Sequence, residues 1–133
     1  MIDEYIRRWI TKAVRDLRVA EHELSLPTDE IITDAVCFHC QQAVEKFLKA
    51  YLASKNVDFG KTHNLEYLVE LCAKADPEFK SIPLGNLSFY AVEIRYPDEF
   101  YIPSLDEASE SFQIAVNVKS FVFKKLGINE ETG

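Results

Sequence analysis

The sequence predicts an all-α fold, an antiparallel up-and-down bundle of four main helices plus one short helix. Apolar residues recur at helical spacing along most of the 133 residues. The four Gly and five Pro fall mainly at the joints between these stretches. No apolar and polar alternation is long enough to indicate a strand. Because long helices with short connections pack as antiparallel neighbours, a bundle is the expected architecture.

Residues 35–52 predict the central helix. The stretch has neither Gly nor Pro and is rich in Ala, Leu, Lys, Glu and Gln, which favour helices. Two apolar rows at helical spacing indicate contacts on more than one side. The first row is Ala35, Val36, His39, Ala43, Phe47, Ala50 and Tyr51, and the second is Cys37, Cys40, Val44, Leu48 and Leu52.

Residues 2–24 predict the helix before it. Five acids and five bases balance over this stretch, which is typical of a solvated outer face and not of a basic arm. Pro27 ends the helix, because proline disfavours helical geometry in the residue before it. We expect Thr28 or Asp29 to cap the central helix, which then runs to about residue 55.

The middle of the chain predicts a loop over residues 56–63 and the short helix over residues 64–74. Asp76 and Pro77 break that helix. The next main helix is expected to start within residues 84–87 and to end before Pro97. Its expected inner face is Leu87, Tyr90, Ala91 and Ile94.

The last helix is bounded by two recognisable caps. Ser104 and Glu107 fit a capping box, and Gly127 stands where a C-terminal cap glycine belongs. We therefore expect one domain over residues 1–127 and a frayed tail over residues 128–133. The inward stripe is Leu105, Ala108, Phe112, Ala115, Val122 and Leu126. A second row, Ile114, Val118 and Phe121, lies off the main face and is either core or a subunit contact.

Length and composition bound the class of protein. A chain of 133 residues is one domain by length and buries enough surface for its own core. Its net charge of -7 argues against a general DNA binder and a polybasic membrane binder, because both depend on clustered Lys and Arg. No apolar run reaches the roughly 20 residues that span a bilayer. Three cysteines make no disulfide framework, so we expect a cytoplasmic protein.

Four stretches carry a family resemblance through their order and spacing. They are Trp9 with residues 12–21 (KAVRDLRVAE), residues 38–52 (FHCQQAVEKFLKAYL), residues 62–65 (THNL), and Arg95-Tyr96-Pro97 followed by Asp106-Glu107-Ala108. Together they resemble the HEPN domain family, small helical bundles related to the C-terminal domain of kanamycin nucleotidyltransferase. The resemblance spans roughly residues 5–126.

The resemblance implies a homodimer that acts with a small nucleotidyltransferase partner, in many members as a toxin–antitoxin pair. For active toxins it implies a metal-independent ribonuclease whose Arg and His are spaced as R-x4-6-H near the end of the fourth helix. Arg95 matches that arginine, but positions 100–102 hold Phe, Tyr and Ile. Cleavage of RNA without a metal needs a group that takes the 2′-hydroxyl proton, and imidazole suits that role.

We therefore interpret the chain as a dimeric module that binds a nucleotide or a partner protein. The alternative is a divergent ribonuclease in which Arg95 stabilises phosphate charge. In that alternative Tyr101, or a histidine from elsewhere, acts on the proton. A phenol is a poor base near neutral pH because its pKa is about 10.

Arg95 and Tyr96 are the first candidates for ligand binding. Arginine's planar fork suits phosphate oxygens, and an aromatic ring beside it can stack on a base. The structural alternatives are an ion pair for Arg95, and core packing plus a dimer interface for the aromatic ring. On the central helix, Lys46 and Lys49 form a polar strip with Glu45. The strip is either a solvated face or a phosphate-binding patch that faces Arg95.

The histidines and cysteines have structural interpretations beside functional ones. His39 lies on the apolar side of the central helix, where it is either a buried, hydrogen-bonded residue near Gln42 or a ligand-binding group. His63 opens the short helix and either caps it, pairs with a carboxylate or binds ligand. Cys37 and Cys40 are best explained as core residues. We expect neither a metal nor a cofactor.

Overall fold

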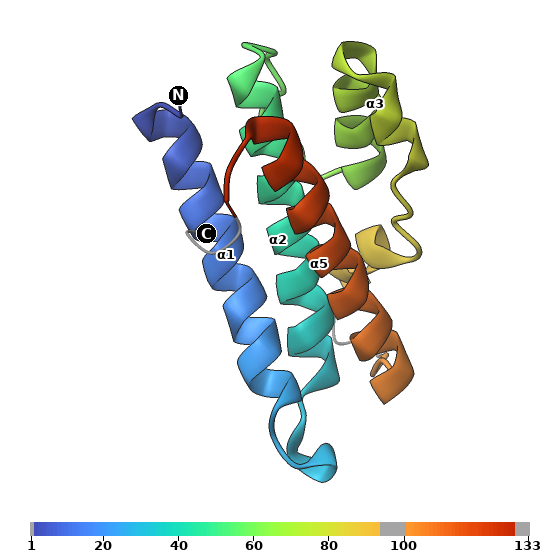
Figure 1. The fold of residues 1–133 in the computed structure, drawn as a ribbon. Helices are drawn as coiled ribbons and strands as arrows, with labels where there is room; N and C mark the ends of the chain where they lie inside the picture. Colours follow the sequence, from blue (N-terminus) through green and yellow to red (C-terminus); the bar gives the residue numbers. More distant parts are fainter. Residues whose placement is uncertain (1, 94–100, 130–133) are drawn as a thin grey trace.

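The computed structural model describes residues 2–93 and 101–129 and confirms the all-α bundle (Figure 1). Three long helices lie side by side: α1 (Glu4–Leu24), α2 (Thr33–Ser54) and α5 (Leu105–Leu126). α1 runs antiparallel to α2 and α5, which run parallel to each other. The described residues add two shorter helices, α3 (Leu65–Ala75) and α4 (Tyr90–Glu93).

α2 forms the centre of the bundle because both of its predicted apolar rows are largely buried. Phe47 packs edge-on against Phe123 of α5, with ring centroids 5.9 Å apart. Tyr51, one turn further along α2, packs on Phe79, with centroids 4.4 Å apart. Aromatic pairs at these separations contribute about 0.5–1.5 kcal/mol beyond the area that they bury. α2 therefore packs against both the last helix and the segment after α3.

Caps fix both ends of α5 where the sequence predicts them, and a cap that was not predicted fixes the start of α1. The capping box of α5 is confirmed, because the Glu107 N–H donates to Ser104 Oγ and the Ser104 N–H donates to the Glu107 carboxylate, both at 3.0 Å. Gly127 follows α5 with a φ of 70°, which a residue with a side chain rarely adopts. At the start of α1, the Asp3 carboxylate accepts a backbone N–H of the first turn at 2.9 Å.

The start of α2 differs from the prediction of a cap at Thr28 or Asp29. Those residues belong to a separate 3-10 turn, Thr28–Glu30, and α2 begins only at Thr33. The capping position is Ile32, which has no side-chain acceptor, and its N–H donates to Glu23 Oε2 at 2.9 Å. A carboxylate from the end of α1 thus holds this junction, and local sequence patterns do not reveal such a partner.

The fourth main helix of the prediction is short in the described residues. Gly85, with a φ of 53°, lies in an irregular segment that a 3-10 turn, Leu87–Phe89, joins to α4. A glycine tolerates this backbone at low cost, whereas a side chain would strain it. The expected inner face is buried where it is described, at Leu87, Tyr90 and Ala91, and Ile94 lies outside the described residues.

The second apolar row of α5 packs within the single chain, which decides between the two alternatives in favour of core. Ile114 and Val118 are 8% and 1% exposed inside the single chain. Phe121 packs edge-on against Phe79, with centroids 4.9 Å apart. The segment after α3 covers this side of α5, which the sequence pattern could not place. Leu105, expected to point inward, is 38% exposed instead.

The chain returns towards α1 after α5. The Ile128 N–H donates to the Phe123 carbonyl at 2.9 Å, and the Ile128 side chain packs half-buried against the core. The packed chain therefore includes a residue beyond the predicted boundary at 127. Within residues 2–93 and 101–129, no helix has both the length and the hydropathy that crossing a membrane requires.

Candidate functional site

Carboxylates hold both predicted lysines of α2. Lys46 Nζ donates to Asp16 Oδ2 at 2.5 Å, and Lys49 Nζ donates to Glu45 Oε2 at 3.0 Å. The side chains of Glu45 and Lys49 are only 4% and 5% exposed, so the prediction of a solvated face is wrong for this pair. The positive charges of Lys46 and Lys49 are compensated by carboxylates within the fold, so they attract a phosphate only weakly.

Asp16 of α1 joins α1 to α2 through two partners. Its Oδ1 lies 2.9 Å from His39 Nδ1, while its Oδ2 accepts from Lys46. His39 is therefore hydrogen-bonded, as predicted, but it is half-buried rather than buried and its partner is not Gln42. Gln42 instead donates to Gln41 Oε1 at 2.7 Å. Asp16, which the sequence places among the balanced charges of a solvated face, thus connects α1 to α2.

Glu45 lies at the centre of a second hydrogen-bonded cluster, which it forms with His63 and Lys49. His63 Nδ1 lies 3.0 Å from Glu45 Oε1, which confirms the prediction that His63 pairs with a carboxylate. The His63 side chain is 61% exposed, whereas Glu45 is buried. A proton on Nδ1 leaves Nε2 as the acceptor nitrogen, so a buried carboxylate orients an accessible imidazole. Lys49 Nζ completes the cluster and lies 5.4 Å from the centroid of the Trp9 ring.

Tyr101 is tied to the start of α5. Its hydroxyl donates to Glu107 Oε1 at 2.5 Å, and the Tyr90 hydroxyl donates to Glu107 Oε2 at 2.9 Å. The hydrogen bond to the carboxylate raises the pKa of Tyr101. Hydrogen bonds from the Ser104 backbone and from Tyr101 lower the pKa of Glu107. A phenol with a raised pKa is a weaker candidate for a general base than a free tyrosine.

Arg95 and Tyr96 lie outside the described residues. Their roles as ligand-binding residues, and the role of Arg95 in the ribonuclease alternative, therefore remain predictions from the sequence. The predicted link between Arg95 and the lysines of α2 is likewise untested. What the structure does establish is that Lys46 and Lys49 face carboxylates of α1 and α2.

The cysteines are core residues, as predicted for Cys37 and Cys40. Both thiols are fully buried and unpaired, as is Cys72. Burial raises the pKa of Cys37 to about 11 and that of Cys72 to about 12. Ser111 Oγ donates to Cys37 Sγ at 3.5 Å, which satisfies a buried hydroxyl. Over the described residues, no three His, Cys, Asp or Glu side chains gather as a metal site would require.

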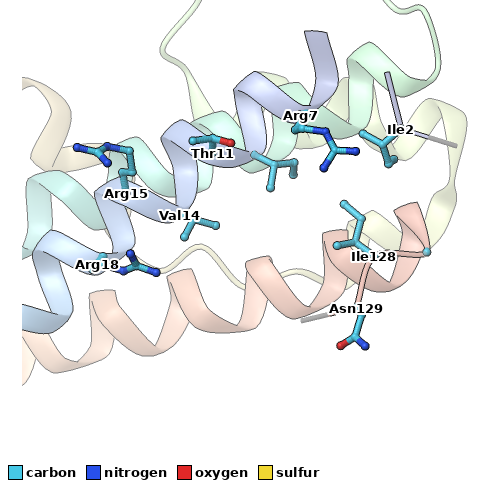
Figure 2. Close-up of a pocket in the computed structure, with 10 residues that line it drawn as sticks. Ile2, Arg7, Thr11, Val14, Arg15, Arg18, Ile128 and Asn129 are labelled. Atoms are coloured by element: carbon cyan, nitrogen blue, oxygen red, sulfur yellow. The ribbon is translucent and has the colours of Figure 1, made fainter. Parts of the chain in front are cut away.

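A groove that the sequence did not predict lies beside α1, the helix whose acids and bases balance in number (Figure 2). A hollow of about 510 Å³ lies beside α1 and is lined by Arg7, Arg15 and Arg18, with Ile128 and Asn129 on the opposite side. The three arginines recur at i, i+8 and i+11, which brings them to one side of a helix. The total charge of residues 2–24 does not reveal this side, and a helical wheel reveals it only in part, because Asp3, Glu4 and Glu21 fall within or close to the same arc.

Comparison with known proteins agrees with the fold. The profile of the HEPN domain family matches residues 6–126. The chain is similar to TT1696 from Thermus thermophilus, known from a crystal structure, with 25% sequence identity and a TM-score of 0.65. That similarity covers 92% of this chain and 99% of TT1696. Among curated proteins, no relative matched the sequence.

Proposed function

Because the chain belongs to the HEPN domain family, we propose that it is a dimeric binding module that leaves RNA intact. It binds a nucleotide or a partner protein, and a small nucleotidyltransferase is the partner that the family resemblance suggests. The reducing cytoplasm suits its three buried, unpaired thiols. In this role the bundle supplies surfaces for association rather than chemistry.

The observation that carries this proposal concerns the proton acceptor of a ribonuclease. The positions that would hold the family's catalytic histidine after Arg95 contain Phe100, Tyr101 and Ile102. Tyr101 is the only one of these with a titratable group, and its hydroxyl already donates to Glu107. Because this bond raises the pKa of Tyr101, the phenol is poorly suited to accept the 2′-hydroxyl proton near neutral pH.

Three measurements on the purified protein test the proposal. Incubation with tRNA and mRNA should leave both intact. Light scattering after size exclusion should give twice the chain mass, and a small nucleotidyltransferase encoded beside the protein should co-purify with it. Cleavage of RNA that Arg95→Ala abolishes would refute the proposal, whereas cleavage that survives this substitution would indicate a contaminating nuclease.

One observation favours a second candidate, the divergent ribonuclease. His63 combines an exposed ring with a buried carboxylate at 3.0 Å, an arrangement that general bases use. In this candidate Glu45 orients His63, whose Nε2 accepts the proton, and Arg95 stabilises phosphate charge. His39 also pairs with a carboxylate, but its side chain is 30% exposed and shares Asp16 with Lys46.

A pair of substitutions tests this candidate. His63→Gln keeps a hydrogen-bonding group next to Glu45 but removes the titrating imidazole. Any genuine cleavage should fall by about 100-fold or more in His63→Gln, which is the lower range for loss of a general base. His39→Gln, the matched control, should retain cleavage. Equal loss in both variants would show that the effect is structural.

A further inference from the structure

The groove beside α1 is longer than the hollow in Figure 2 alone. A second hollow of about 310 Å³ continues it between α1 and α5, and the two share Val14 and Arg18. Along α1 the lining residues run from Arg7 to Glu21. Fourteen residue steps at a rise of about 1.5 Å give a length of roughly 21 Å, or about four helical turns. This extent exceeds what one small molecule needs.

Aliphatic side chains form the walls of the groove and cations form its edges. The aliphatic lining comes from both helices and from the turn after α5: Ile2, Ile10, Val14, Val116 and Ile128. Arg7, Arg15 and Arg18 supply positive charge from α1, and Lys119 adds a cation from α5. Glu21 is the single acid among the described residues that line it.

Several cations among the described residues are paired with a carboxylate, but the arginines of the groove are not. Lys46, Lys49 and Lys125 each bind a carboxylate, and Arg8 lies 3.9 Å from Glu4. Among the described residues, Arg7, Arg15 and Arg18 form no such pair. Their charge stands out in a chain whose net charge is -7. The groove therefore presents charge that a partner, not the fold, is available to neutralise.

We propose that this groove binds one amphipathic helix of a partner protein, with an apolar face flanked by Asp and Glu. Such a helix places aliphatic side chains on the floor and carboxylates opposite the arginines, which form bidentate pairs with them. A helix of about 14 residues matches the length of the groove. The inference rests on the proposed binding function and names the chemistry of its partner.

A second copy of the chain and a nucleic acid fit the groove less well. A two-fold dimer through this face would set one furrow against another and bring the same arginines together, which like-charge repulsion opposes. Single-stranded nucleic acids stack their bases on aromatic rings, whereas the lining that the described residues form has one aromatic side chain, the half-buried Phe112. The dimer of the proposed function therefore uses another surface.

Fluorescence anisotropy with a labelled peptide tests the inference on the full chain. The probe is a helical peptide of about 18 residues with Leu on one face and flanking Glu, and the control peptide has Lys in place of Glu. The Glu peptide should bind, and its affinity should fall as NaCl rises from about 50 mM to about 500 mM, because salt screens exposed charges. Hydrogen exchange on the unmodified protein should show new protection in α1 and α5.

Charge reversal on α1 gives the matched comparison. Arg7→Glu with Arg18→Glu should weaken peptide binding by about tenfold or more, because both ends of the groove then repel it. Arg8→Glu makes the same kind of change on the same helix, outside the groove, and should alter affinity by less than about twofold. Both variants change exposed residues, so circular dichroism should be that of the unmodified protein.

Several results would overturn the inference. These are equal binding of the Lys peptide, protection away from α1 and α5, or an unaffected double variant. If an RNA oligonucleotide displaces the peptide, and the double variant no longer binds this RNA, the groove is a polyanion site. If the double variant loses the dimer, the groove is a self-association face. If the peptide binds only after removal of residues 130–133, the groove belongs to the chain's own end. RNA cleavage, in contrast, bears on the proposed function and not on peptide binding.

Discussion

Replacing Lys49 by Met should destabilise the protein strongly, because it leaves the buried carboxylate of Glu45 without its lysine partner. Glu45 and Lys49 are 4% and 5% exposed, so the carboxylate of the variant cannot regain full hydration. Removing one partner of a buried pair costs about 3–5 kcal/mol. His63 still lies 3.0 Å from Glu45, so we expect the lower end, about 3 kcal/mol. Methionine keeps an apolar contact with the nearby Trp9 ring.

The loss converts into a measurable shift in melting temperature. Unfolding entropy near 60 °C is about 2.1 cal/mol/K per residue, which gives roughly 0.28 kcal/mol/K for a chain of this length. A loss of about 3 kcal/mol therefore lowers Tm by about 10 °C. Urea unfolding followed by far-UV circular dichroism, at one fixed protein concentration, gives the free energy directly.

A double variant separates stranded charge from lost packing. Glu45→Gln with Lys49→Met removes both charges and keeps an acceptor for His63, so it should recover most of the stability lost by Lys49→Met. Arg8→Ala is the surface control, because the Arg8–Glu4 pair is 3.9 Å long and mostly exposed, and it should change stability by less than about 0.5 kcal/mol. The reasoning fails if Lys49→Met costs no more than Arg8→Ala, or if the double variant is as unstable as the single one.

Three further predictions concern the helix ends and the core. Because the folded-state pKa of Glu107 lies below its ordinary 4.5, its contribution to stability is present above that value and is lost as pH falls through the folded pKa. The stability advantage over Glu107→Gln should therefore shrink from about pH 5 to about pH 3 in acid unfolding curves, and a constant difference would contradict this. Ser104→Ala should cost about 1 kcal/mol in urea unfolding through loss of the capping box, whereas Ser109→Ala, at an exposed position in the same helix, should cost little. The three buried thiols should react with a disulfide reagent at pH 8 only when the protein unfolds, because burial raises their pKa, and fast reaction of any one in the native state would be evidence against it.

Features that depend on neighbours in the sequence were predictable. The capping box at Ser104, the cap glycine at Gly127 and the core rows of α2 all depend on residues a few positions apart. These features are local, because a cap is a hydrogen bond between a side chain and a backbone group of the same turn, and a core row is a set of apolar residues at helical spacing. The bundle follows from these elements because helices with short connections have few ways to bury their apolar faces.

Partners from distant parts of the chain were not predictable by the same means. Asp16, Glu23 and Glu45 look alike in the sequence, as acids on polar helices. In the fold, Asp16 bridges two helices, Glu23 holds the start of α2, and Glu45 orients His63. Which acid finds which partner depends on how α1 and α2 pack, and no pattern within either helix contains that. The second apolar row of α5 could not be assigned to core or interface for the same reason, because the segment around Phe79 covers it.

The same packing moves the candidate binding surface from α2 to α1. The sequence places cations on both helices, and those of α2 belong to the stretch that most resembles the HEPN family. Packing brings Asp16 of α1 to Lys46, and Glu45 pairs with Lys49 one turn along α2, so the charges of α2 contribute to the fold. Since Asp16 is thereby engaged across the helix pair, it is not available to the arginines on the opposite side of α1. The groove on that side of α1 thus holds Arg7, Arg15 and Arg18, with Glu21 as the single acid among its described lining residues, and the proposed partner helix would bring the carboxylates that these arginines lack.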